Sequence, residues 1–153
     1  MNSITFQFNR VTIHLRKRVI FTPMKKNTQK QFAGVWLDNA KAIIISNTPE
    51  TENSDYTIKD KVKAKANHAG GSEHSMNNSK QGDFVKYFKS VSGLLTNYDE
   101  ILLFGPGKSQ EQFQNHLHED AHFKSKQITV ESAEQLTDPQ MISKVREFFK
   151  NRQ

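Results

Sequence analysis

The sequence contains no cysteine and no long hydrophobic run. The absence of cysteine excludes a disulfide framework, catalysis by a thiolate and any zinc site with sulfur ligands. The longest strongly apolar runs, residues 42–45 and 101–104, are much shorter than the roughly 18 residues that a membrane-spanning helix needs. We therefore expect a soluble protein with no membrane partner. The missing cysteine fits a reducing compartment, so we expect it in the cytoplasm.

Acidic residues are missing from residues 1–23, although this segment holds four basic residues, Arg10, Arg16, Lys17 and Arg18. The whole chain has 22 basic and 16 acidic residues, a formal charge of +6, and leaving out those four gives 18 against 16, or +2. The rest of the chain is therefore nearly neutral. Its total charge does not predict a basic face over the whole domain, but it is compatible with a local basic patch.

This change of composition predicts an extension over residues 1–23 and a single α/β domain over residues 24–153. Two interpretations of the extension stay open. In the first it is a flexible basic arm or an added edge strand that touches RNA or a membrane. In the second it is upstream sequence included through a mis-assigned start codon, because Met24-Lys25-Lys26-Asn27-Thr28 is a plausible natural start.

Local patterns predict three strands followed by alternating helices and strands. The β-rich runs 32–37 and 40–46 flank Asp38-Asn39, a pair that suits a tight hairpin turn. Residues 56–62 alternate like a third strand with one wet face. Residues 66–80 have almost no apolar side chain, so we expect a long exposed loop there.

From Asp83 the apolar residues recur at helical spacing, which predicts the first helix. A buried strand at 99–104 follows, and Ser109 and Gln112 have the capping-box spacing that opens a second helix. A short strand at 127–130 and a helix that begins with Thr137-Asp138-Pro139-Gln140 complete the order. The order β-β-β-α-β-α-β-α predicts an α/β fold with a ribonuclease H-like mixed sheet.

No nucleotide cofactor is expected from the segment Gly105-Pro106-Gly107-Lys108-Ser109. A phosphate-binding loop of nucleotide hydrolases needs a glycine at the position of Leu102, so the motif fails. Two interpretations remain: the segment is a plain turn into a helix, or Lys108 and the exposed amides beside it contact a phosphate.

No metal site is expected either. A two-metal nuclease site needs carboxylates from separate elements, and the strand that ends at Phe104 offers none. His118 and His122 are four residues apart, but a third ligand at a fixed position is missing. We expect these histidines, with Glu119 and Asp120, to form a solvated helix end.

The segment with adjacent glycines, residues 65–75, is a candidate binding segment. Gly70-Gly71 permits backbone conformations closed to other residues and a close approach to a ligand. The alternative is a flexible linker between strand and helix. Strand alternation would also place Lys59, Lys61, Lys63 and Lys65 on one face, either as a solvated row or as a ridge toward RNA.

The polar loop with Gly70-Gly71, the helix near Phe84, the following strand, Gly105-Pro106-Gly107-Lys108 and the helix with Phe113 together resemble a known family. Over about residues 32–150 the chain is similar to the central domain of eukaryotic and archaeal peptide-chain release factors and of Pelota. Stand-alone bacterial relatives of that domain include release-factor-like, host attachment and translational machinery proteins. The resemblance therefore implies a bacterial member of this group.

In release factors the loop carries Gly-Gly-Gln, which helps to position water against the peptidyl-tRNA ester. Here Ser72 stands in place of that glutamine. Pelota-like members also lack the glutamine, and they act by binding ribosomes. The resemblance thus implies a translation factor associated with the ribosome or with tRNA, without catalytic residues, metal or cofactor.

The expected RNA-contact loop consists of His68, Gly70, Gly71, Ser72 and His74. The expected phosphate contacts are Lys63, Lys65 and Lys108. Two alternatives stay open. One is a peptidyl-tRNA hydrolase in which a backbone amide and a nearby polar group replace the glutamine, and the other is a protein-interaction module without RNA contact.

Overall fold

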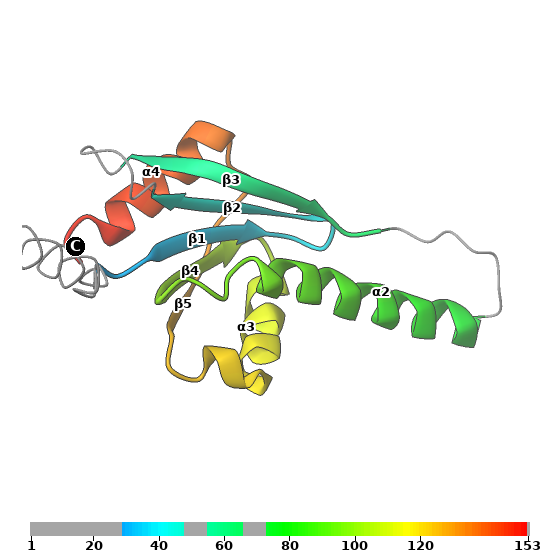
Figure 1. The fold of residues 1–153 in the computed structure, drawn as a ribbon. Helices are drawn as coiled ribbons and strands as arrows, with labels where there is room; N and C mark the ends of the chain where they lie inside the picture. Colours follow the sequence, from blue (N-terminus) through cyan, green and yellow to red (C-terminus); the bar gives the residue numbers. More distant parts are fainter. Residues whose placement is uncertain (1–28, 48–54, 66–72, 153) are drawn as a thin grey trace, which may run out of the picture.

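The computed structural model describes residues 29–47, 55–65 and 73–152, with side chains from Lys80 onward in the last stretch. The expected extension over residues 1–23 lies outside the described residues. The elements, drawn in Figure 1, follow the predicted order. They are β1 (Phe32–Leu37), β2 (Lys41–Asn47), β3 (Tyr56–Lys63), α2 (Glu73–Gly93), β4 (Glu100–Gly105), α3 (Ser109–Glu119), a 3-10 turn η1 (Ala121–Phe123), β5 (Gln127–Ser132) and α4 (Asp138–Phe149).

The five strands form one mixed sheet in the order β3-β2-β1-β4-β5. The pairs β1–β2 and β2–β3 are antiparallel, whereas β1–β4 and β4–β5 are parallel. The predicted ribonuclease H-like sheet is confirmed. The predicted hairpin turn is confirmed as well, because Asp38 Oδ1 accepts the backbone N–H groups of Ala40 at 2.7 Å and Lys41 at 2.8 Å.

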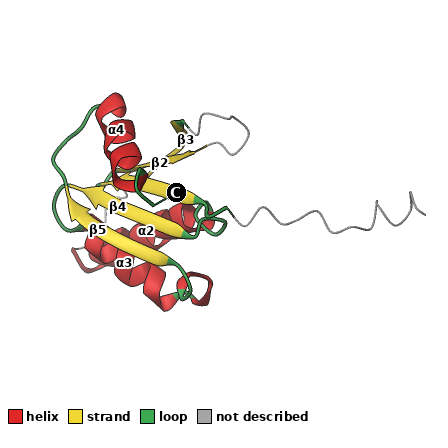
Figure 2. Ribbon diagram, turned by 90° about the vertical axis from the view of Figure 1, so that its left-hand side faces the viewer, coloured by secondary structure: helices red, strands yellow, loops and turns green. Residues whose placement is uncertain are grey.

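Helices cover both faces of the sheet, with α2 and α3 on one face and α4 on the other (Figure 2). Along β1 the side chains alternate between the two layers. Val35 and Leu37 pack in the core under α2 and α3, whereas Trp36 packs in the core under α4. Gly34 also lies on the α4 side, where an added Cβ would overlap the Val145 side chain. Glycine is therefore required for the close approach of α4 to the central strand.

One end of the sheet gathers several chain segments. Because β1 and β4 are parallel, both end there, and β2 begins and β3 ends beside them. We call this end the carboxyl edge and define it by residues 38–41, 63–65 and 105–109. In open α/β sheets, ligands bind outside the carboxyl ends of the parallel strands.

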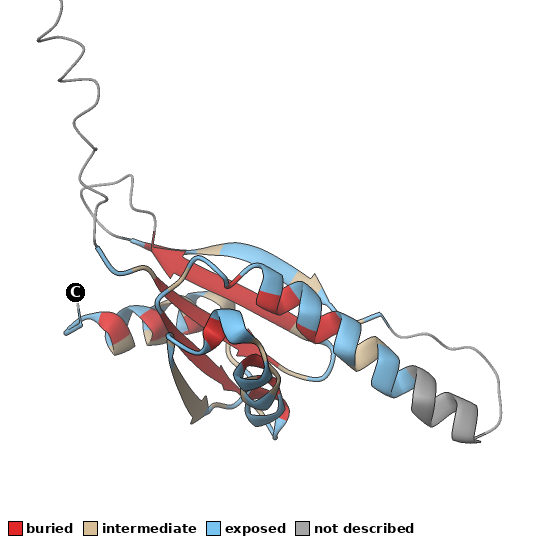
Figure 3. Ribbon diagram, turned by 60° about the horizontal axis from the view of Figure 1, so that its bottom comes forward, coloured by how far each residue is buried: buried red, intermediate tan, exposed pale blue. Residues whose placement is uncertain are grey.

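Helix α2 begins ten residues earlier than the sequence predicts, at Glu73 instead of Asp83. The expected loop over residues 66–80 is therefore wrong for residues 73–80. Figure 1 shows that this first part of α2 extends past the carboxyl edge, and Figure 3 shows the buried residues of its second part facing the sheet. Residues 73–83 contain one apolar residue, Met76, so no apolar stripe announces the helix. None of the described helices is long and apolar enough to cross a membrane.

Candidate functional site at the carboxyl edge

The end of β3 is fixed beside the hairpin turn. The Ala64 N–H donates to the Ala40 carbonyl at 2.8 Å, and Lys63 lies opposite Lys41 in the strand register. The side chains of Lys63 and Lys65 are exposed, and neither forms an ion pair with a described residue. Lys63, the last residue of β3, and Lys65, two residues after it, are therefore both exposed at the carboxyl edge.

The expected row of four lysines on one face of β3 is interrupted. The register of β3 against β2 shifts between Ile44 and Ile45, and Lys59 is the additional residue at this bulge. Lys61 lies on the α4 face and forms an ion pair with Asp138 at 2.7 Å. Only the end of the row, at Lys63 and Lys65, remains as a basic group without an acidic partner among the described residues.

The loop after β4 brings Lys108 to the same edge. Gly107 has a φ of +72°, a left-handed conformation that favours glycine, and Lys108 is the exposed N-cap residue of α3. At Gly105 an added Cβ would overlap the Leu37 carbonyl, so the ends of β1 and β4 lie very close together. Lys108 forms no ion pair with a described residue.

The predicted capping box of Ser109 and Gln112 does not form. Ser109 is buried, and its hydroxyl donates to Asn39 Oδ1 at 2.5 Å instead of capping α3. No side chain caps the first turn of α3. The sequence pattern is misleading here because the same serine has a better-placed acceptor in the β1–β2 turn, which only the folded chain brings near.

The carboxyl edge is strongly basic by composition. Its described segments contain four lysines, Lys41, Lys63, Lys65 and Lys108, and one carboxylate, Asp38. That carboxylate accepts two backbone N–H groups within its own turn. The Lys41 ammonium lies 5.2 Å from the ring centroid of Trp36, so it stays at the edge over an aromatic face. These segments of the near-neutral domain therefore carry more basic than acidic side chains.

Tyr87 supports the turn from below. Its hydroxyl donates to the Asp38 carbonyl at 3.2 Å, and its ring is buried. Burial raises the pKa of the Tyr87 phenol well above its ordinary value, and the nearby Asp38 carboxylate raises it further. The phenol thus keeps its proton and its hydrogen bond to the turn under physiological conditions.

Most of the expected RNA-contact loop, namely His68, Gly70, Gly71 and Ser72, lies outside the described residues. The position of His74 is a correction, because it belongs to the first turn of α2 and not to a loop. The helix extends over it because residues 73–80, although polar, are compatible with a solvated helix. The end of β3 lies at the carboxyl edge, and the start of α2 lies beyond it (Figure 1).

A groove that the sequence does not predict lies beside this edge. It has a volume of about 810 Å³ and is lined by Asn39, Lys80, Gln81, Phe84, Phe88 and Gln112. These residues come from the β1–β2 turn, α2 and α3, which are distant in sequence. Of these, only the aromatic residues carried a sequence signal, and it indicated a helix and not a site.

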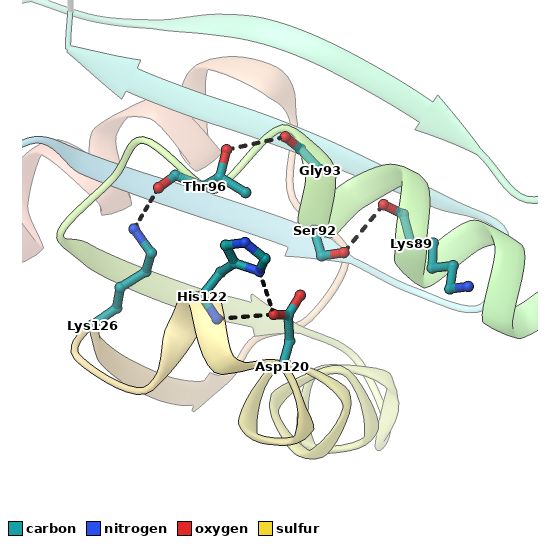
Figure 4. A network of polar contacts seen from close by, with 7 residues as sticks. All are labelled: Lys89, Ser92, Gly93, Thr96, Asp120, His122 and Lys126. Atoms are coloured by element: carbon teal, nitrogen blue, oxygen red, sulfur yellow. Dashed lines mark hydrogen bonds and ion pairs between the residues drawn. The ribbon is translucent and has the colours of Figure 1, made fainter.

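His118 lies near the end of α3, and His122 lies in η1. His122 Nδ1 lies 2.7 Å from Asp120 Oδ1, the pair drawn in Figure 4. Hydrogen bonds from the His122 backbone and ring lower the pKa of the Asp120 carboxyl. Within residues 29–47, 55–65 and 73–152 no three potential ligands are grouped for a metal ion. His118 is exposed on α3.

The fold defines an α/β domain with a ribonuclease H-like mixed sheet covered by helices on both faces. No protein-family model matches the chain, and no curated protein matches its sequence. Among solved structures, the Pelota protein of Thermoplasma acidophilum aligns over 87% of this chain and 36% of its own, with a TM-score of 0.51 and 18% identity. Pelota of Archaeoglobus fulgidus aligns over 92% of this chain and 35% of its own, with a TM-score of 0.51 and 15% identity.

At these identities the likeness shows a shared fold. The chain spans about a third of the length of either Pelota protein. The resemblance to Pelota that the sequence predicts is thereby confirmed for the fold.

Proposed function

We propose that this chain is a ribosome- or tRNA-associated translation factor that binds RNA without catalysing a reaction. In this proposal the carboxyl edge contacts RNA phosphates through Lys63, Lys65 and Lys108. The adjoining segment with His68, Gly70, Gly71, Ser72 and His74 makes the closer contacts. The observation that carries the proposal is the imbalance at the carboxyl edge, where four lysines face one carboxylate that is occupied by its own turn.

The spacing of the lysines suits an extended polyanion. Lys63 is the last residue of β3, and Lys108 lies three residues after the end of β4. In the sheet, β3 and β4 are separated by three strand spacings. At about 4.8 Å per spacing this amounts to roughly 14 Å across the edge. Lysines spread over this distance suit contacts with successive phosphates of a nucleic acid.

The shared fold supports the assignment to translation. The sequence resembles the central domain of release factors and Pelota, and the structure has the fold of part of archaeal Pelota. Pelota-like proteins act by binding ribosomes. Because the chain spans about a third of Pelota, only ribosome or tRNA contact is proposed for it, and no activity of the whole protein.

The absence of a catalytic role is proposed on chemical grounds. Ser72 replaces the glutamine with which release factors position the hydrolytic water. In the described segments of the carboxyl edge there is no histidine, and Asp38 already accepts two backbone N–H groups. These segments therefore offer no free general base for hydrolysis.

The test is co-sedimentation with ribosomes of the source organism at low salt. The triple variant Lys63→Glu, Lys65→Glu, Lys108→Glu should lose most of the sedimenting protein. A matched control, Lys89→Glu, Lys124→Glu, Lys150→Glu, has the same net charge and changes exposed lysines away from the carboxyl edge. The control should sediment close to the wild-type level. No sedimentation of the wild type at low salt, or equal losses in both triple variants, would contradict the proposal.

A further inference from the structure

The groove lies where α2 leaves the body of the domain. Its α2 side is formed by Lys80, Gln81, Phe84 and Phe88, which follow one another at helical spacing, and α3 contributes Gln112 opposite. Figure 3 shows α2 running past α3 in this region. The groove is therefore adjacent to the carboxyl edge but separate from its lysines.

The groove has an aromatic floor. The rings of Phe84 and Phe88 meet edge to face, with centroids 5.2 Å apart and an interplanar angle of 84°. Phe88 is buried at 7% exposure, whereas Phe84 is only partly buried although it packs against the same core. One aromatic ring thus remains partly open to a ligand.

The described residues of the groove form a polar rim that includes no carboxylate. It carries three carboxamides, from Asn39, Gln81 and Gln112, and one ammonium group, from Lys80. The Ser109 hydroxyl donates to Asn39 Oδ1, which orients the amide and leaves its N–H donors without a described acceptor. The side chains of Gln81 and Gln112 also have no described hydrogen-bond partner. Donors and acceptors are thus both present around an aromatic floor.

We propose that this groove binds one unstacked nucleotide of single-stranded RNA. The base would stack on Phe84, the carboxamides would hydrogen-bond its edge, and Lys80 would contact a phosphate. Carboxamides suit bases because they donate and accept side by side. An amphipathic peptide helix fits less well, since it would bury a row of apolar side chains, and this groove offers two rings within a polar rim.

This inference deepens the proposed function, because it assumes that the ligand is RNA. The experiment uses the full chain and labelled hexauridylate, with fluorescence anisotropy as the readout. Phe84→Ala should weaken binding about 5- to 150-fold, the range for loss of one base–aromatic stack. Gln112→Ala should weaken binding severalfold, and the matched control Gln114→Ala, in the same helix outside the groove, should not.

A second measurement keeps the inference testable if Phe84→Ala fails to fold. Uridine monophosphate should shift the side-chain amide NMR signals of Asn39, Gln81 and Gln112 in the wild type. Ribose 5-phosphate, which has the phosphate but no base, should leave them in place. Equal shifts with both compounds, or none with either, would overturn the inference, as would unchanged hexauridylate binding in Gln112→Ala and in folded Phe84→Ala.

The two proposals fail in different ways. Ribosome sedimentation that depends on the carboxyl-edge lysines, combined with no effect of the groove variants, would leave the proposed function standing and overturn the groove. Base-dependent shifts in the groove without ribosome sedimentation would support the groove and contradict the translation role. A photoreactive residue at Gln81 that cross-links on ribosomes to protein and never to RNA would also overturn the groove as a nucleotide site.

Discussion

The Ser109 hydroxyl lies 2.5 Å from Asn39 Oδ1 and thereby joins the start of α3 to the turn between β1 and β2. Asn39 lines the groove, and Ser109 directly follows Lys108 of the carboxyl edge. This hydrogen bond therefore holds the groove and Lys108 next to each other. Ser109→Ala should lower the free energy of unfolding by about 1 kcal/mol, measured by urea denaturation. Ser143→Ala, at an exposed position of α4, should change it by less than about half that value. Equal stability of the two variants would contradict a structural role for the bond.

Gly34 should not tolerate a side chain. An added Cβ would overlap Val145, so Gly34→Ala should lower the free energy of unfolding by about 1–3 kcal/mol. Gly34→Ala combined with Val145→Ala should be more stable than the sum of the two single changes predicts, since the smaller residue vacates the space. Gly82→Ala, which has open space on α2, serves as the control and should be neutral or slightly stabilising. Strict additivity of the pair would contradict the overlap.

Stability should fall at high pH because of Tyr87. Burial holds the pKa of this phenol above the value of about 10 that it has in the unfolded chain. The unfolded chain therefore loses this proton first, and the free energy of unfolding decreases as pH rises above about 10. Tyr87→Phe should reduce this alkaline slope at the expense of the hydrogen bond to Asp38. Chemical denaturation at pH 8 and pH 10.5 measures the change in the free energy of unfolding. An unchanged slope in Tyr87→Phe would contradict the role of Tyr87 in the alkaline loss of stability.

RNA binding should become less salt-dependent without the edge lysines. For single-stranded RNA, the slope of log K against log salt is about −0.7 for each phosphate contact. Lys63→Gln, Lys65→Gln, Lys108→Gln should therefore make the slope for hexauridylate shallower by up to about 2. The triple control Lys89→Gln, Lys124→Gln, Lys150→Gln should keep the wild-type slope. A similar change in both would indicate a diffuse effect of net charge.

Peptidyl-tRNA hydrolysis should be absent. With Ser72 in place of glutamine, the wild type should release no peptide above background from peptidyl-tRNA on ribosomes. Gly70→Val, Gly71→Val should lower ribosome binding without changing release. Release by the wild type that this double change abolishes would contradict the proposal and favour the enzymatic alternative.

Sequence patterns predicted the fold where local chemistry and tertiary structure agree. Asp38-Asn39 forms the hairpin turn because the Asp38 carboxylate accepts hydrogen bonds from backbone N–H groups of the same turn. At the start of α4, where Thr137-Asp138-Pro139-Gln140 predicted the beginning of a helix, Gln140 Oε1 accepts the Thr137 backbone N–H at 2.9 Å. Such hydrogen bonds join residues that are close in sequence, so they can be predicted from a local sequence pattern.

The sequence-based predictions are wrong where the local structure depends on contacts between segments distant in sequence. Residues 73–80 gave no helix signal because they have no apolar stripe, although they continue a helix that Tyr87 and Phe88 anchor farther on. Ser109 had the spacing of a cap, but Asn39 is its partner. The bulge at Lys59 follows from the register of β3 against β2, which no local pattern records. The groove is formed by the β1–β2 turn, α2 and α3, which are distant in sequence, so no local pattern predicted it.

Helix α2 is one uninterrupted helix of 21 residues, and its packed half anchors the rest. At about 1.5 Å per residue, the ten residues before Asp83 place the first turn roughly 15 Å farther along the axis. The number of residues in this helix therefore sets how far the first turn of α2 reaches past the carboxyl edge. Removing or adding seven residues before Asp83 would shorten or lengthen that reach by about 10 Å while preserving the helix face to within about 20°.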